Sequence, residues 1–250
     1  MANKKTVALT EKQYREIIDT MEKKCPKNIL KNTYDEIKIL KEKTLIGQYY
    51  EFLYDKYKIV YHKQDYNIKN LELPKEYYIV FPSASTELKR WPIDRYAKII
   101  KKIYKKTKLP ILFCGTNSDI ESINELKKLI KDIPQYDYVN KTSLLEFFEV
   151  IKQSKFVITN DTSTYHIAVI NEIPVAIITG GFTYDRYVEY DFKGNEKYKK
   201  PYIIVNKMDC FNCYNRCCKI NSKDSIWPCL DKIAIDDAWK IIEKMIDKEL

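Results

Sequence analysis

The sequence predicts a doubly wound α/β fold, a parallel sheet between two layers of helices, preceded by a helical N-terminal extension. From residue 77, short apolar runs alternate with longer segments whose apolar residues recur every three or four positions. This strand–helix alternation occurs four times and ends in a fifth strand, which favours parallel strands joined by crossover helices. Residues 1–76 are mainly helical by periodicity and lack alternating strands. We therefore divide the chain into an extension with linker, residues 1–76, and an α/β domain, residues 77–250.

The expected strands are short and rich in β-branched or aromatic residues. They cover residues 77–81, 109–114, 136–139, 156–159 and 174–178, with a sixth at 202–205. The expected helices cover residues 92–106, 119–131 and 143–153, the segment after Thr162, and residues 235–250. Pro92 suits a first helical position, and Ser143 with Glu146 has the spacing of a capping box. The apolar residues of the second helix are Ile123, Leu126, Leu129 and Ile130.

The composition suits a protein with a core of its own, since 45% of the 250 residues are hydrophobic. No apolar run approaches the roughly 20 residues that span a bilayer. The N-terminus also lacks the apolar core of a signal peptide. We therefore expect a cytoplasmic protein.

The net charge of +9 favours anionic partners such as nucleotides, phosphates, nucleic acid or an acidic membrane surface. The alternative is that the lysines, which are spread along the chain, only solvate the surface. The five glycines form neither a Gly-x-Gly-x-x-Gly turn nor a Gly-x4-Gly-Lys-Ser/Thr loop. Any phosphate site must therefore be built in another way.

Polar side chains and glycines follow each of the first five predicted strands. Ser83, Ser85, Thr86 and Lys89 follow the first, Gly115 the second, Lys141 and Thr142 the third, Asp161 to Ser163 with His166 the fourth, and Gly180-Gly181 the fifth. Ligands of doubly wound sheets bind at the carboxyl ends of the strands, so we expect these groups to meet at one edge. Hydroxyl and amide donors with a cation suit a diphosphate.

The stretch from Asn160 to His166 is the most informative of these strand ends. A predicted strand stops there in an Asp-Thr-Ser turn that opens a helix, and the unpaired N–H groups of a helix start suit a phosphate. The same residue types are good N-caps, so plain helix initiation is the alternative. His166 could equally pack within the helix layer, and Lys89 could be a surface lysine. For Trp91 we expect packing rather than ligand contact.

Four motifs follow one another in the α/β domain. They are the Ser-rich turn Pro82–Ser85, Lys89-x-Trp-Pro92 with Arg95-Tyr96, Lys141-Thr-Ser-Leu144, and Asn160-Asp-Thr-x-x-x-His166-x-Ala168 followed by Pro174-Val175. In this order and spacing they resemble glycosyltransferase family 9, which includes the lipopolysaccharide heptosyltransferases. The resemblance covers about Tyr77 to Gly181. It implies a GT-B fold, two Rossmann-like domains with the active site between them, of which residues 77–250 are the nucleotide-sugar-binding domain.

The resemblance implies a donor-binding role for the residues at the strand ends. Lys89 is expected to face the donor phosphates, with Ser85 and Thr86 as hydroxyl contacts beside it. The turn at Asp161 is expected to cradle the diphosphate and donor sugar, with His166 just inside the helix. The full expected set is Ser83, Ser85, Thr86, Lys89, Gly115, Lys141, Thr142, Asp161, Thr162, Ser163 and His166.

The chain departs from the family pattern at three places. Ser163 stands where many members have Gly, and Gly180-Gly181 replaces the more usual Phe-Gly-Pro. Residues 1–76 contain no Gly-Asp turn, which in the family's acceptor domain carries the general base. We therefore interpret residues 1–76 as a reduced or truncated acceptor domain and assign no catalytic base.

By resemblance, the expected activity is inverting, metal-independent transfer of a sugar, such as heptose, from a nucleotide-diphosphate donor to lipopolysaccharide or another surface glycan. An ADP-sugar is the favoured donor, no cofactor is expected for catalysis, and contact with the inner membrane face is expected to be peripheral. The alternative is a non-catalytic nucleotide-sugar-binding module, or a donor half that needs a separate acceptor domain. A zinc-containing nucleic-acid-binding protein ranks below both, because Arg is scarce near the cysteines, so no nucleic-acid partner is expected.

Five of the seven cysteines follow residue 209. The spacing Cys210-x2-Cys213-x3-Cys217, followed by Cys229, is compatible with a thiolate metal site, for which structural zinc is favoured. An iron–sulfur cluster, reduced thiols and disulfides are the alternatives, of which disulfides are disfavoured in the cytoplasm. We therefore expect a cysteine knuckle at residues 210–229.

Overall fold

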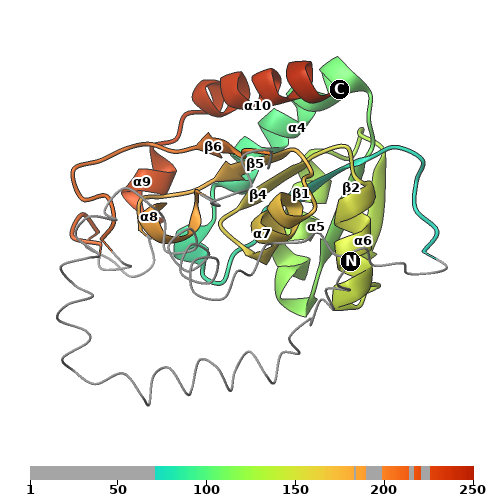
Figure 1. Ribbon diagram of the computed structural model, residues 1–250, viewed down its shortest axis with the longest axis horizontal. Coiled ribbons are helices and arrows are strands. Elements are labelled where there is room, and N and C mark those ends of the chain that lie inside the picture. Colours follow the sequence, from blue (N-terminus) through green and yellow to red (C-terminus); the bar gives the residue numbers. More distant parts are fainter. Residues whose placement is uncertain (1–70, 183, 190–198, 214–216, 221–225) are drawn as a thin grey trace, which may run out of the picture. The chain divides into compact units, whose positions relative to one another are not determined.

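The computed structural model describes residues 71–182, 184–189, 199–213, 217–220 and 226–250. Within these ranges six parallel strands form one sheet in the order β3-β2-β1-β4-β5-β6 (Figure 1). The strands are β1 (Tyr78–Phe81), β2 (Ile111–Gly115), β3 (Gln135–Val139), β4 (Val157–Asn160), β5 (Val175–Ile178) and β6 (Tyr202–Ile204). The predicted doubly wound parallel sheet is therefore confirmed.

Helices connect the strands where the periodicity predicts them. The longer ones are α4 (Ile93–Thr107), α5 (Ile120–Leu129), α6 (Leu144–Gln153), α7 (Ser163–Ile170) and α10 (Ile235–Glu249). Within the described residues, the structure adds four short helices that the sequence did not predict: η1 (Glu87–Lys89), η2 (Asn117–Asp119), α8 (Tyr184–Tyr187) and α9 (Pro228–Asp231). Three or four residues are too few to show a helical period.

The start of α6 confirms the predicted capping box. The Glu146 N–H donates to the Ser143 hydroxyl at 3.3 Å, and the Ser143 N–H donates to the Glu146 carboxylate at 2.7 Å. The helical extension predicted for residues 1–76 lies, up to residue 70, outside the described residues. Among the helices that the structure describes, none is both long and apolar enough to cross a membrane.

Each face of the sheet has its own core. Helices α4, α5 and α10 pack on one face, and α6 and α7 pack on the other (Figure 1). Successive residues of a strand point to opposite faces, so Tyr78 and Val80 belong to the first core while Tyr77 and Ile79 belong to the second. The central strands are therefore buried from both sides, which explains their continuous apolar runs.

Three of the four apolar residues noted in the second predicted helix pack in the core. Ile123, Leu126 and Ile130 are buried, but Leu129 is 40% exposed. At 3.6 residues per turn, Leu129 lies at the rim of the face that the other three residues share. It is also the last residue of α5, where the chain already turns toward β3.

The buried side chain of Asn160, the last residue of β4, joins the carboxyl ends of β1 and β4. Its amide nitrogen donates to the backbone oxygens of Pro82 at 2.6 Å and Ser83 at 3.3 Å. Its amide oxygen accepts from the Tyr96 hydroxyl at 2.9 Å and from the Trp91 N–H at 3.4 Å. The strand order reverses between β1 and β4, so this one side chain organises the topological switch point at which doubly wound sheets bind ligands.

We expect Asn160→Ala to lower the free energy of unfolding by about 3 kcal/mol, because buried donors and acceptors lose their partner. Chemical denaturation measures the change. Asn117→Ala is the matched control, since the exposed Asn117 side chain accepts one hydrogen bond, from Asn140 at 2.6 Å. We expect that variant to lose less than about 0.5 kcal/mol. Equal losses in the two variants would contradict a central role for Asn160.

Candidate functional site

Three loops meet at the switch point, one each after β1, β4 and β5. These strands are neighbours in the sheet and run parallel, so the loops that follow them lie along one edge. The loop after β1 leads through η1 to Lys89, and the loop after β5 holds Gly180 to Phe182. The turn after β4 holds Asp161 and Thr162 and leads into α7, where Ser163 and His166 lie. The structure thus brings the residues predicted on the first, fourth and fifth strands to adjacent positions, as the sheet rule requires.

The turn after β4 begins helix α7 without a side-chain cap from Thr162. Thr162 is the N-cap residue with extended backbone, φ −144°, yet its side chain makes no capping hydrogen bond. Its hydroxyl lies 3.1 Å from the Thr159 hydroxyl instead. The Thr162 side chain therefore does not cap α7, and its hydroxyl does not cover the first N–H groups of the helix.

His166 lies one turn into α7 and is half-buried. Burial, the larger effect, lowers the pKa of His166, and the nearby Asp161 carboxylate offsets part of this by raising it. A pKa below the usual value near 6.5 leaves the imidazole neutral at pH 7. The positive field at this edge therefore comes from Lys89 and the helix start rather than from His166.

Lys89, the last residue of η1, is half-buried and carries the predicted cation. Its ammonium lies 4.7 Å from the centre of the Phe182 ring and 5.8 Å from that of Trp227. Among the described residues no carboxylate forms an ion pair with it. Lys89 follows β1 and its ammonium contacts Phe182, which follows β5, and β4 lies between these two strands in the sheet.

The other residues of the Lys89 motif serve the fold. Trp91 is fully buried and its indole N–H donates to the Ile233 backbone oxygen at 3.2 Å, which confirms the expected packing role. Arg95 forms an ion pair with Asp231 at 2.9 Å. These contacts tie the start of α4 to the segment before α10 and leave Lys89 as the motif's cation at the edge.

The remaining predicted donor-binding residues lie either after β1 or at the ends of β2 and β3. Ser85 and Thr86 are exposed beside Lys89, whereas Ser83 is 1% exposed and its hydroxyl has no hydrogen-bond partner among the described residues. Lys141 follows the edge strand β3, and its ammonium donates to the Asp137 backbone oxygen at 2.8 Å. Gly115 and Thr142 lie with Lys141 at the ends of β2 and β3, on the far side of β1 from β4.

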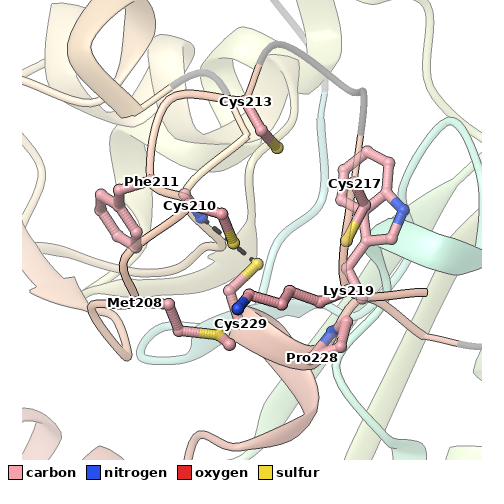
Figure 2. Close-up of a pocket in the computed structure, with 10 residues that line it drawn as sticks. Met208, Cys210, Phe211, Cys213, Cys217, Lys219, Pro228 and Cys229 are labelled. Atoms are coloured by element: carbon pink, nitrogen blue, oxygen red, sulfur yellow. Dashed lines mark hydrogen bonds between the residues drawn. The ribbon is translucent and has the colours of Figure 1, made fainter.

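The predicted knuckle cysteines line one small pocket. Cys210, Cys213, Cys217 and Cys229 share it with Met208, Phe211, Lys219 and Trp227, and Figure 2 shows the sulfur atoms of Cys210 and Cys229 turned toward one another. All four are free thiols, as are Cys114 and Cys218, and Cys25 lies outside the described residues. Within the part of the chain that the structure describes, no three His, Cys, Asp or Glu side chains are arranged to hold a metal ion.

Two thiols of this pocket, Cys210 and Cys229, have raised pKa values. Burial, the largest cause, raises the pKa of Cys229, the hydrogen bond from the Gly181 N–H lowers it, and the other three thiols raise it further. The pKa of Cys210 is also raised, first by burial and then by its neighbour Cys218. Neither Cys210 nor Cys229 therefore has the lowered pKa of a reactive cysteine.

The Gly180-Gly181 pair explains how the cysteine pocket fits against β5. A Cβ on Gly180 would lie 2.6 Å from the Cys229 sulfur, and one on Gly181 would lie 2.2 Å from the Phe211 ring. The Gly181 N–H donates to the Cys229 sulfur at 3.4 Å, and its carbonyl accepts from the Asn212 N–H. Glycine is therefore needed at both positions, where the cysteine knuckle packs against the residues that follow β5.

Sequence reasoning missed Asn160, Phe182 and Trp227 as residues that shape this edge. Asn160 stood in a quoted motif, but only the fold reveals that it bonds to four other residues. Phe182 follows the glycine pair and Trp227 precedes Cys229 by two positions, so proximity to flagged residues was the one available signal.

These features define the class: a doubly wound α/β domain whose polar and cationic groups converge at the switch point. The model of glycosyltransferase family 9 (heptosyltransferase) matches residues 13–178, more than half of the chain. The chain belongs to this family. A comparison with curated protein sequences finds no match.

Solved structures share the fold at low sequence identity. E. coli ADP-heptose LPS heptosyltransferase II has a TM-score of 0.53 and 18% identity, over 70% of this chain and 48% of that one. A glycosyl transferase family 9 protein from Veillonella parvula has a TM-score of 0.51 and 14% identity, over 81% and 51%. TibC, a dodecameric iron-containing heptosyltransferase from enterotoxigenic E. coli solved with ADP-D-β-D-heptose, has 0.51 and 14%, over 72% and 48%. The chain therefore spans about half the length of these proteins.

We expect Gly180→Ala to lower the free energy of unfolding by about 2 kcal/mol, because the added methyl group overlaps the buried Cys229 sulfur. Cys229→Ala removes that sulfur, so the double variant should lose less than the sum of the two single losses. Thermal or chemical denaturation of the four proteins measures this. Strictly additive losses would show that the two residues do not meet as described.

Proposed function

We propose that this protein binds the donor of a glycosyltransferase reaction that moves a heptose from ADP-heptose to lipopolysaccharide or another surface glycan. Family membership supports glycosyl transfer as the reaction class. The choice of donor is supported by heptosyltransferase II and TibC, whose names or bound ligand specify ADP-heptose. We also propose a cytoplasmic location with peripheral contact to the inner membrane, which the net charge of +9 would favour.

The observation that carries the proposal is the Lys89 ammonium. It contacts the rings of Phe182 and Trp227 and forms no ion pair with a carboxylate among the described residues. Lys89 follows β1, and β4, which leads into α7, is the next strand of the sheet. A half-buried cation and a helix N-terminus that follow neighbouring strands both attract a multiply charged anion. A nucleoside diphosphate is such an anion.

The proposed reaction inverts the configuration of the sugar and needs no metal. The bond between the anomeric carbon and the diphosphate oxygen breaks, and its electron pair stays on the diphosphate. The acceptor hydroxyl bonds to the anomeric carbon from the opposite face, and its proton passes to a general base. Lys89 and the N–H groups at the start of α7 would stabilise the negative charge that grows on the leaving group. No described residue is assigned as the base.

We expect calorimetric titration with ADP, UDP, GDP and CMP to show selective binding of ADP. Lys89→Met should weaken that binding by about ten- to a hundred-fold, as the loss of one charge-assisted contact predicts. Lys101→Ala, which removes an exposed lysine on the solvent side of α4, is the matched control and should bind like the wild type. Absence of binding by the wild type, or unchanged binding by Lys89→Met, would refute the assigned site.

The second candidate function is a donor-binding half without transfer activity of its own. The lack of a Gly-Asp turn in residues 1–76 favours it. Release of ADP from ADP-heptose in the presence of a lipopolysaccharide acceptor separates the two candidates. Transfer by this chain alone would reject the binding half, whereas binding without transfer would support it.

We further propose that Cys210, Cys213, Cys217 and Cys229 hold a structural metal, with zinc as the favoured ion. Four thiols around one pocket match a thiolate site in kind and number. The N–H bond to the Cys229 sulfur also suits a thiolate, which binding of a metal would create by displacing the proton. To bind one metal ion, the four cysteine side chains would have to lie closer together than they do in this structure.

Elemental analysis of the purified chain tests this assignment. We expect about one zinc per chain, lost with a fall in melting temperature when a strong chelator is added. Cys213→Ser should lose the metal, whereas Cys218→Ser, which changes the exposed neighbouring thiol, should keep it. Iron in place of zinc would identify an iron site, and absence of both would leave four reduced thiols and refute the proposal.

A further inference from the structure

Two aromatic rings form a seat for the Lys89 ammonium. The ring centres of Phe182 and Trp227 lie 4.6 Å apart, and their planes make an angle of 57°. The ammonium lies within 6 Å of both ring centres. Both side chains are buried, Phe182 at 1% and Trp227 at 6% exposure. A cation at this distance is attracted by the negative face of an aromatic ring, so the seat favours one placement of a flexible side chain.

An aromatic seat differs from an ion pair in what it leaves free. A carboxylate would neutralise the lysine and occupy its N–H donors, whereas a ring face attracts the charge without a full hydrogen bond. The three donors of the ammonium therefore remain for oxygen atoms of a ligand. The rings also exclude water from one side of the charge, which strengthens its attraction for an anion.

The seat is assembled from segments far apart in the sequence. Phe182 follows the glycine pair after β5, and Trp227 precedes α9. The Trp227 N–H donates to the Leu88 backbone oxygen at 3.3 Å, one residue before Lys89. Phe182, Trp227 and Cys229 form one buried cluster, against which Leu88 packs. Trp227 therefore lines the cysteine pocket and also contacts the Lys89 ammonium.

We propose that Phe182 and Trp227 are positioning residues that hold the Lys89 ammonium toward the donor diphosphate. Cys229 supports them, because its sulfur accepts from the Gly181 N–H next to Phe182 and it lies two positions from Trp227. The cysteine knuckle thereby acts on donor binding without touching the donor. This inference rests on the proposed function, since the ligand of Lys89 is the diphosphate.

Titration with ADP and AMP, on the wild type and on Lys89→Met, tests the positioning role. Phe182→Leu and Trp227→Leu should each weaken ADP binding about five- to ten-fold and weaken AMP binding less, because AMP lacks the outer phosphate. Combined with Lys89→Met, neither should cause a further loss, since the ammonium that it positions is gone. Trp227→Phe keeps a ring and should restore most of the ADP affinity.

Phe156→Leu is the matched control, because Phe156 is equally buried but packs on Tyr78 in the first core, which contains neither Phe182 nor Trp227. It should lower the melting temperature while leaving the ratio of ADP to AMP affinity unchanged. If Lys89→Met loses ADP affinity but Phe182→Leu binds ADP like the wild type, the positioning role is refuted and the proposed function stands. A further loss of ADP affinity on adding Phe182→Leu or Trp227→Leu to Lys89→Met would also refute the positioning role. No ADP binding by the wild type would overturn both.

Discussion

The fully buried amide of Asn160 holds the candidate site together. An asparagine side chain has two donors and two acceptor sites, and here both ends are used by groups from the loop after β1 and the start of α4. The loop that Asn160 holds leads to Lys89, and the next residue in sequence is Asp161. One side chain therefore joins the loop that leads to Lys89 to the turn that begins α7. Because burial excludes water as a substitute partner, few other residues could do this.

The Lys-x-Trp-Pro motif shows how a short sequence divides between structure and chemistry. Trp91 and Arg95 bind to backbone and carboxylate groups near Ile233 and Asp231, which anchors the start of α4. Lys89 lies just before them, and its ammonium contacts the Phe182 and Trp227 rings instead. Trp91 and Arg95 anchor the backbone that follows the lysine, whereas the rings favour one placement of its ammonium.

The cysteine segment and the donor edge are one structural unit. The glycine pair after β5 admits the Cys229 sulfur and the Phe211 ring, and Trp227 closes the wall behind Lys89. Gly180 and Gly181 thus leave room for the Cys229 sulfur and the Phe211 ring to pack against β5. A change at either place would be felt at the other, because both approach within van der Waals contact.

The sequence by itself determined the order and type of the main elements, because apolar residues repeat with the period of the surface that they bury. Tyr77–Phe81 reads as a strand and Ile93–Ile103 as a helix face from spacing alone, and parallel strands then bring their polar ends to one edge. It could not determine the exposure of Leu129, the hub role of Asn160 or the ring seat under Lys89. Each of these depends on contacts between residues distant in sequence, and Phe182 and Trp227 meet only after β5 and α9 have packed. Local patterns record which face is apolar; the partners of a buried polar or charged group are decided by tertiary packing.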